Sequence, residues 1–203
     1  MTLSIHLEKL ETQLEALPTL GHETFITQDG AMSLVALMMV GAVKRSLSLG
    51  HGLICMVNAK NMTCARALVR MQIDTISRLL AYTYVDDPEQ VVLKVIGGKA
   101  LNAFKSKEGK NLRDGYLIEK MTESYPWVRE VYKSTSGDVH FSEQQFFASV
   151  LSTDDAKRTM TLAVSPFDNK YPESSWSEVV LCFHKLNLIL IDLLNSRILH
   201  KKG

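Results

Sequence analysis

Apolar residues along most of the chain recur at helical spacing, which predicts a series of amphipathic helices. The first predicted helix covers residues 3–17 and ends at Pro18, because proline lacks the amide hydrogen that a helix interior needs. Its apolar positions follow alternating steps of four and three residues: Leu3, Leu7, Leu10, Leu14 and Leu17. Two heptads are too short for an independent coiled coil, so we expect this helix to pack on the body of the protein.

The next segments predict several core helices between residues 31 and 140. One helix is expected from 31 to 48, with Asp29 as its cap and a stop near Gly50 and Gly52. The following helix is expected from near residue 53 to Tyr84. Its core-facing positions are Val69, Ile73, Ile76 and Leu80. A cap and proline at Asp87 and Pro88 predict another helix start, and the pair Gly97 and Gly98 predicts its end.

The pattern changes after His140, where apolar residues alternate with polar ones. This period of two predicts a β-hairpin at about residues 146–165, which we expect to lie against the helical body because an isolated hairpin is marginally stable. Helical spacing then returns and predicts a C-terminal helix over residues 175–199. The predicted fold is one domain, residues 1–203, of the all-α class: a helical bundle with a small β-hairpin inserted before the C-terminal helix.

Composition limits the location and the partners of the protein. A net charge of +1 gives no bulk field that would attract nucleic acid or an anionic membrane. The three cysteines have no Cys-x-x-Cys spacing, so we expect neither a disulfide framework nor a zinc ribbon and favour a reducing cytoplasm. The most apolar window, residues 31–43, is shorter than the roughly 20 residues that cross a membrane, so no membrane partner is expected.

A stripe of charged residues is predicted on the helix after residue 53. Arg66, Arg70, Asp74 and Arg78 follow one another at four-residue steps among small residues, and three arginines face one carboxylate. The surplus positive charge would be balanced by a carboxylate from elsewhere or by an anionic ligand. The alternative is that the stripe forms ordinary ion pairs on a helix surface, each worth a few tenths of a kcal/mol.

A second polar face is predicted near residue 132. Arg129, Tyr132, Ser136 and His140 lie at helical spacing and share one face if the helix continues through Gly137. Tyr132 and His140 could equally be half-buried residues whose polar ends bond to the backbone. We interpret His184 and Asn187, on the last helix, as solvent or packing positions.

Signatures of common enzymes are missing from the sequence. It contains no phosphate-binding Gly-x-x-x-x-Gly-Lys-Ser/Thr loop, no Gly-x-Gly-x-x-Gly after a strand and no His-Glu-x-x-His. The six histidines include no pair four residues apart, so no metal site and no cofactor are expected.

The two polar segments together resemble a bacterial helical family of unknown function. The resemblance rests on Arg70 with Asp74 one turn later, an Asp-Pro break at Asp87, and a Tyr-x-x-x-Ser-x-x-x-His motif at residues 132–140. That family is distantly similar to the HEPN group of helical bundles, many of which are metal-independent endoribonucleases in defence or toxin-antitoxin systems. The usual HEPN signature places His four to six residues after Arg. Here Arg129 precedes His140 by eleven residues, so Arg and His would have to meet between helices.

The resemblance implies an RNA-targeting or nucleotide-phosphate-binding protein, as an endoribonuclease in antiphage defence. His140 would act as acid or base, Arg70 and Arg66 would hold phosphate, and Asp74 would orient an arginine. Tyr132 or Ser136 would bond to the substrate. The competing hypothesis is a non-enzymatic helical module that binds a ligand or a protein and has an anion pocket. RNA or a nucleotide is the expected partner, and a homodimer could form through the N-terminal seam or the last helix.

Overall fold

The computed structural model describes residues 2–25, 33–140 and 142–202, and this part of the chain folds as helices with one two-stranded hairpin. The α-helices are α1 Leu3–Phe25, α2 Leu34–Asn58, α3 Met62–Leu80, α4 Pro88–Ile96, α5 Asp114–Ser124, α6 Val128–Val139, α7 Glu143–Ser149 and α8 Glu173–Lys202. The strands are β1 Val150–Asp154 and β2 Thr159–Leu162, and short 3₁₀ turns follow α3 and α4. The prediction of an all-α bundle with a hairpin before the last helix is confirmed.

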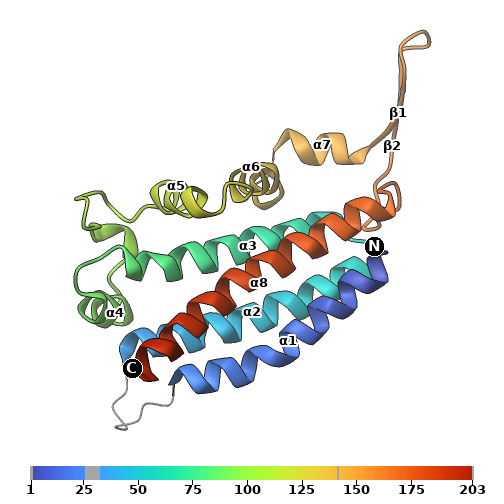
Figure 1. Cartoon of the computed structure of the whole chain (residues 1–203). Coiled ribbons are helices and arrows are strands. Elements are labelled where there is room, and N and C mark those ends of the chain that lie inside the picture. The colour runs from blue at the N-terminus through green and yellow to red at the C-terminus, as the bar shows by residue number, and fades with distance from the viewer. Residues whose placement is uncertain (1, 26–32, 141, 203) are drawn as a thin grey trace.

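Four long helices, α1, α2, α3 and α8, run side by side and form the main body (Figure 1). α1 packs on α8 and α2, and α3 packs on α2 and α8. α5 and α6 cover the side of α3 that faces away from α1, while α4 lies at one end of the body. α3 therefore packs on other long helices with one side and on the outer layer of α5 and α6 with the other.

The core is filled from all four long helices. The N-terminal seam packs inward, as expected, because Leu10, Leu14 and Leu17 are at most 1% exposed. On α3 the predicted core face is confirmed for Val69, Ile73 and Ile76, and Leu80 is partly buried against the same core. α8 contributes Val180, Phe183, Leu186, Leu190 and Leu194.

The predicted C-terminal ends of the first two helices are wrong. α1 does not end at Pro18 but continues to Phe25, where Gly21 packs closely against Val43 of α2. α2 passes through Gly50 and Gly52 and ends at Asn58. In both cases tertiary packing outweighs the local helix-breaking tendency. The predicted cap Asp29 lies outside the described residues.

The true break between α2 and α3 falls at residues 59–61. Lys60 has a positive φ of 54°, which reverses the chain, and the Asn61 side chain then accepts a hydrogen bond from the Cys64 amide. The start of α4 agrees with its prediction, since the Asp87 side chain accepts from Gln90 and Pro88 is the first helical residue.

A fully buried polar contact joins three of the long helices. Gln72 of α3 donates from Nε2 to Ser46 Oγ of α2 at 2.8 Å and to Asn187 Oδ1 of α8 at 2.9 Å. All three side chains are 0% exposed. Asn187, which the sequence placed at a solvent or packing position, is thus a packing position, and its amide oxygen also accepts a hydrogen bond from a buried donor.

The hairpin does not lie against the helical body, and that expectation is wrong. β1 and β2 pair antiparallel, and the hairpin projects away from the bundle beyond α7 (Figure 1). Every residue of β2 is exposed. Lys170 instead stabilises the base of the hairpin, because its Nζ donates hydrogen bonds to the carbonyl oxygens of Phe147 and Val150 at 3.2 Å each. Main-chain pairing and this lysine hold the hairpin in place of a hydrophobic face.

In the part of the chain that the structure describes, no helix carries an apolar stretch long enough to cross a membrane.

The contact between α1 and α2 can be tested at Gly50. A Cβ added there would lie 2.6 Å from Leu14 Cδ2 and 2.8 Å from Leu14 Cδ1, and Leu14 is buried. We expect Gly50→Val to lower the free energy of unfolding by about 1–3 kcal/mol relative to Gly41→Val, measured by urea denaturation. Gly41 is the matched control because it lies on the same helix and no atom of the described residues is within 4 Å of an added Cβ. Equal stability of the two variants would contradict this close packing.

Candidate functional site

The predicted charged stripe exists on the outer side of α3, but its residues have three different environments. Arg70 and Asp74 form an ion pair with each other, and Arg78 pairs with Asp114 of α5 at 3.0 Å. No ion pair with a described carboxylate is formed by Arg66. The surplus positive charge of the stripe is thus partly balanced by a carboxylate from another helix. The charge of Arg66 is not balanced by an ion pair within the described residues.

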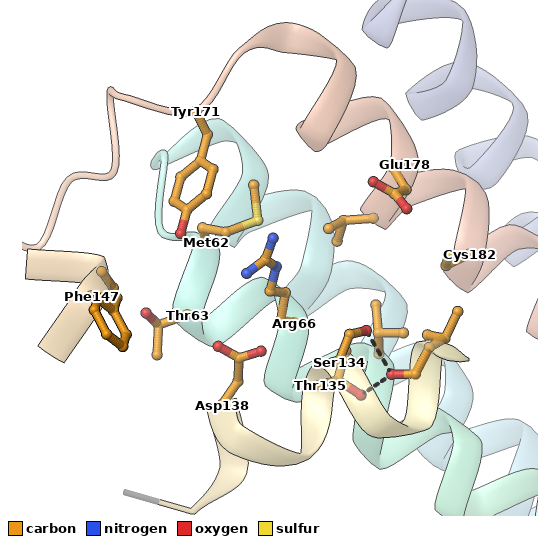
Figure 2. Close-up of a pocket in the computed structure, with 14 residues that line it drawn as sticks. Met62, Thr63, Arg66, Ser134, Thr135, Asp138, Phe147, Tyr171, Glu178 and Cys182 are labelled. Carbon is orange, nitrogen blue, oxygen red and sulfur yellow. Dashed lines mark hydrogen bonds between the residues drawn. The ribbon is translucent and has the colours of Figure 1, made fainter. Parts of the chain in front are cut away.

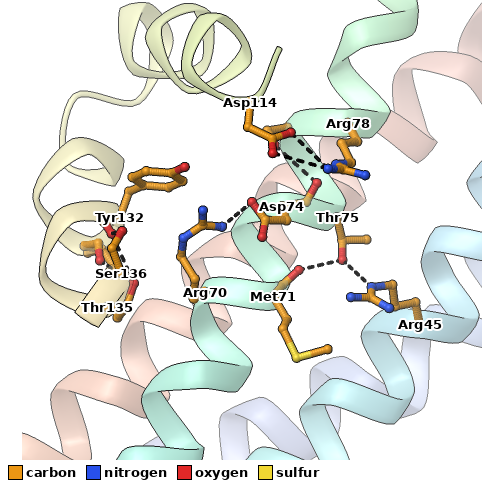
Figure 3. Close-up of polar contacts among 12 residues, drawn as sticks. Arg45, Arg70, Met71, Asp74, Thr75, Arg78, Asp114, Tyr132, Thr135 and Ser136 are labelled. Atoms are coloured by element: carbon orange, nitrogen blue, oxygen red, sulfur yellow. Dashed lines mark hydrogen bonds and ion pairs between the residues drawn. The ribbon is translucent and has the colours of Figure 1, made fainter. Parts of the chain in front are cut away.

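The centre of the stripe is covered by α6. The Arg70 guanidinium carbon lies 3.7 Å from the centroid of the Tyr132 ring, a cation–π contact (Figure 3). The Arg70 side chain is 12% exposed and that of Asp74 is 33% exposed, so water screens this pair only in part. Fold geometry therefore brings together Arg70, Asp74 and Tyr132, from two segments that lie far apart in the sequence.

The other two predicted residues of α6 lie further along this helix. Ser136 donates its hydroxyl to the Tyr132 carbonyl at 2.6 Å, so it bonds within its own helix. α6 does continue through Gly137, as predicted, and ends at Val139. His140 follows this last helical residue and is exposed to solvent, and the His140 amide donates to the Ser136 carbonyl. His140 does not line the pocket around Arg66 that is described next.

A pocket of about 420 Å³ opens at the start of α3, between α3, α6, α7 and α8. Figure 2 shows the Arg66 guanidinium pointing into the space between Tyr171, Asp138 and Glu178. Met62, Val69, Val131 and Val179 supply part of the apolar wall. Cationic, anionic, aromatic and apolar groups thus meet in one hollow, which is typical of a site for a small polar ligand.

The loop before α8 positions the aromatic wall of this pocket. Asp168 accepts a hydrogen bond from the Met62 amide at 2.8 Å through Oδ2, and its own amide donates to the Lys60 carbonyl at 2.7 Å. The loop is thereby fixed to the first turn of α3. Three residues later, the Tyr171 ring lies 5.2 Å from the Arg66 guanidinium carbon. Capping of α3 and placement of Tyr171 therefore depend on the same loop.

Asp138 of α6 is the least satisfied polar group in the pocket. Its Oδ2 atom is buried and has no hydrogen-bond partner among the described residues. Burial raises the pKa of Asp138 above its ordinary value of 3.8, Arg66 opposes that shift, and the negative charge of Asp168 adds to it. The pocket therefore presents a desolvated carboxyl that would gain from a hydrogen-bond donor on a ligand.

The pocket offers little nucleophilic or metal chemistry. Burial raises the pKa of the Cys182 thiol to about 11, so this side chain is a thiol rather than a reactive thiolate at neutral pH. Among the described residues, no group of three His, Cys, Asp or Glu side chains is arranged to hold a metal ion.

The sequence predicted Arg66 as a site residue but did not predict the residues that surround it in the pocket. Asp138 is part of the motif segment 132–140, yet the helical spacing that selected Tyr132, Ser136 and His140 passes over it. Tyr171 and Glu178 come from a loop and a helix more than 100 residues after Arg66. An acid two residues before His140 was the only local signal for any of these.

Searches of family models, of curated proteins and of solved structures give no match for this chain. The resemblance to HEPN bundles and the roles that it implies therefore stay predictions, and function has to be argued from the pocket itself.

The raised pKa of Asp138 predicts a gain of stability when the charge of this side chain is removed. Because its pKa is raised in the folded state, ionisation at neutral pH opposes folding, and this cost vanishes as pH falls below 3.8. We expect Asp138→Asn to raise the free energy of unfolding at pH 7, with a gain that shrinks toward pH 4. Urea denaturation at several pH values would measure it, with Asp155→Asn on the exposed hairpin turn as control. A gain that did not depend on pH would contradict the assigned cause.

Proposed function

We propose that the protein binds a nucleotide-like ligand, with an anionic phosphate and a base that donates hydrogen bonds, in the pocket around Arg66. The observation that carries this proposal is a pair of groups that line the same hollow: Arg66, which forms no ion pair with a described carboxylate, and the buried Asp138 Oδ2, which accepts no hydrogen bond from a described donor. Each would be satisfied by the opposite end of one ligand.

The chemistry of the lining groups supports this ligand class. A guanidinium fork matches phosphate oxygens, and a carboxylate accepts from the amino or imino groups of a nucleobase. Tyr171 and Phe147 add aromatic surface on which a base can lie. The volume of about 420 Å³ lies in the range of small-molecule sites. A simple anion would leave Asp138 unsatisfied, so a ligand with both features fits better.

Binding of the four ribonucleoside 5′-monophosphates, measured by calorimetry in the presence of a chelator, tests this proposal. We expect at least one of them to bind, with affinity reduced at least about tenfold by Arg66→Gln or by Asp138→Asn, because each removes a charge-assisted hydrogen bond. The unphosphorylated nucleoside should bind more weakly than its monophosphate.

Lys133→Gln is the matched control for Arg66→Gln. Like Arg66→Gln, it removes one positive charge, but from α6, and Lys133 is exposed and does not line the pocket. An equal loss in this variant would show that net charge, rather than the pocket, holds the ligand. Lack of binding by all four monophosphates would overturn the proposal.

The alternative function, metal-independent RNA cleavage with His140 and Arg70, has its own test. A ligand-binding module without this activity leaves total RNA intact after incubation in a chelator, and this is the result that we expect. Cleavage that is lost in both His140→Ala and Arg70→Ala would instead support the endoribonuclease. Cleavage that is unchanged in both variants would point to a contaminating nuclease.

A further inference from the structure

A second pocket, of about 650 Å³, lies at the other end of the charged stripe. Its walls come from α2, from the second half of α3 and from the segment after α4 that contains Lys99 and Leu101. Arg66 and Arg78 are twelve residues apart on α3, which corresponds to about 18 Å along the helix axis. The two pockets are therefore separate sites on one helix.

This second pocket has an excess of positive charge. Among the described residues, Arg45, Arg78 and Lys99 line it together with one carboxylate, Asp74. Asp74 is paired with Arg70, and Arg78 is paired with Asp114. Counting these two partners, four cations face two carboxylates, which leaves a net charge of +2. The Arg66 pocket, in contrast, is lined by one arginine and two carboxylates.

Two of the cations are held in place by groups that do not neutralise them. Arg45 donates from Nε to Thr75 Oγ1 at 2.9 Å, and Thr75 donates in turn to the Met71 carbonyl at 2.8 Å (Figure 3). This bond fixes the direction of the Arg45 side chain and leaves its terminal nitrogens for another acceptor. Lys99 Nζ lies 4.8 Å from the centroid of the Phe104 ring, a contact that keeps its charge.

The rest of the lining is largely apolar. Met38, Leu79, Val95 and Leu101 contribute hydrocarbon surface, and Tyr82 contributes a ring that is 5% exposed. A small hydrated anion would use the cations but leave this surface uncovered. A ligand with a doubly charged end and an apolar body would use both.

We propose that the pocket between α2, α3 and the segment 99–101 binds a phosphomonoester attached to an apolar or aromatic group. A phosphomonoester carries close to two negative charges at neutral pH, which matches the net charge of the pocket, and its oxygens suit the Arg45 fork. The phosphate lies between Arg45 and Lys99, and the body of the ligand lies against Met38 and Leu101. This site is independent of the proposed nucleotide pocket around Arg66.

Phenyl phosphate is a suitable probe, and its binding to the full chain can be measured by calorimetry. We expect phenyl phosphate to bind more tightly than inorganic phosphate, which lacks the ring, and than phenol, which lacks the charge. Arg45→Gln and Lys99→Gln should each weaken binding at least about tenfold, because each removes one phosphate contact. Equal binding of phenol, or no binding of phenyl phosphate, would overturn the proposal.

Two control variants separate this pocket from bulk charge and from the other site. Lys44→Gln removes a charge from α2 next to Arg45, but Lys44 bonds to Ser48 and does not line the pocket, so binding should not change. Arg66→Gln should likewise leave phenyl phosphate binding intact. A loss in Lys44→Gln equal to that in Arg45→Gln would refute a specific pocket. A loss in Arg66→Gln alone would assign the probe to the other site.

A steric variant tests the pocket without changing its charge. Gly41 lines the pocket and has open space where a side chain would begin, so Gly41→Trp can fill it. We expect this variant to lose phenyl phosphate binding while it keeps the thermal stability of the parent within a few degrees. Retained affinity at full stability would place the probe elsewhere and overturn the proposal.

Discussion

The buried amide of Gln72 fixes the rotation and the register of the helix on which both pockets depend. Its donors must be satisfied away from water, and Ser46 and Asn187 satisfy them only when α2, α3 and α8 are aligned in one way. Arg70 lies two residues before Gln72, about 200° around the helix. A buried Gln72 therefore turns the arginine stripe outward, toward α6.

From that rotation follows the division of the stripe into three parts. Tyr132 covers the centre, where Arg70 and Asp74 neutralise each other in partial shelter from water. The two ends, at Arg66 and Arg78, each line a pocket. One hollow carries more carboxylates than cations and the other more cations than carboxylates, although one helix contributes to both.

The sequence was informative where the position of a side chain depends on the spacing within its own helix. It was uninformative where that position depends on contacts with another element. Periodicity found the α1 seam and the core face of α3 because burial repeats with the helical turn. It failed at Pro18 and Gly50, where contacts between α1 and α2 decide whether the helix continues. The prediction that the hairpin packs against the helical body was also wrong. Its exposed position depends on hydrogen bonds from Lys170, which residue spacing does not reveal.

The neighbours of the charged stripe could not all be predicted from helical spacing, because other elements supply them. The spacing of Arg66, Arg70, Asp74 and Arg78 predicted one surface but not its partners. Tyr132 of α6 was predicted on a second polar face, but Asp114 of α5 and Tyr171 of the loop before α8 were not, and packing between elements brings all three to the stripe. The polar face of a helix can be predicted from the sequence of that helix, whereas the residues that contact this face can be identified only from the tertiary fold.

The neutral ion pair at the centre of the stripe also determines how its two ends affect each other. Arg66 and Arg78 are about 18 Å apart along α3, which exceeds the Debye length of about 8 Å at physiological salt. The pair of Arg70 and Asp74 between them carries no net charge. A ligand bound at one end therefore changes the potential at the other end very little. Coupling between the pockets would have to pass through movement of α3 itself, which the buried contacts of Gln72 oppose.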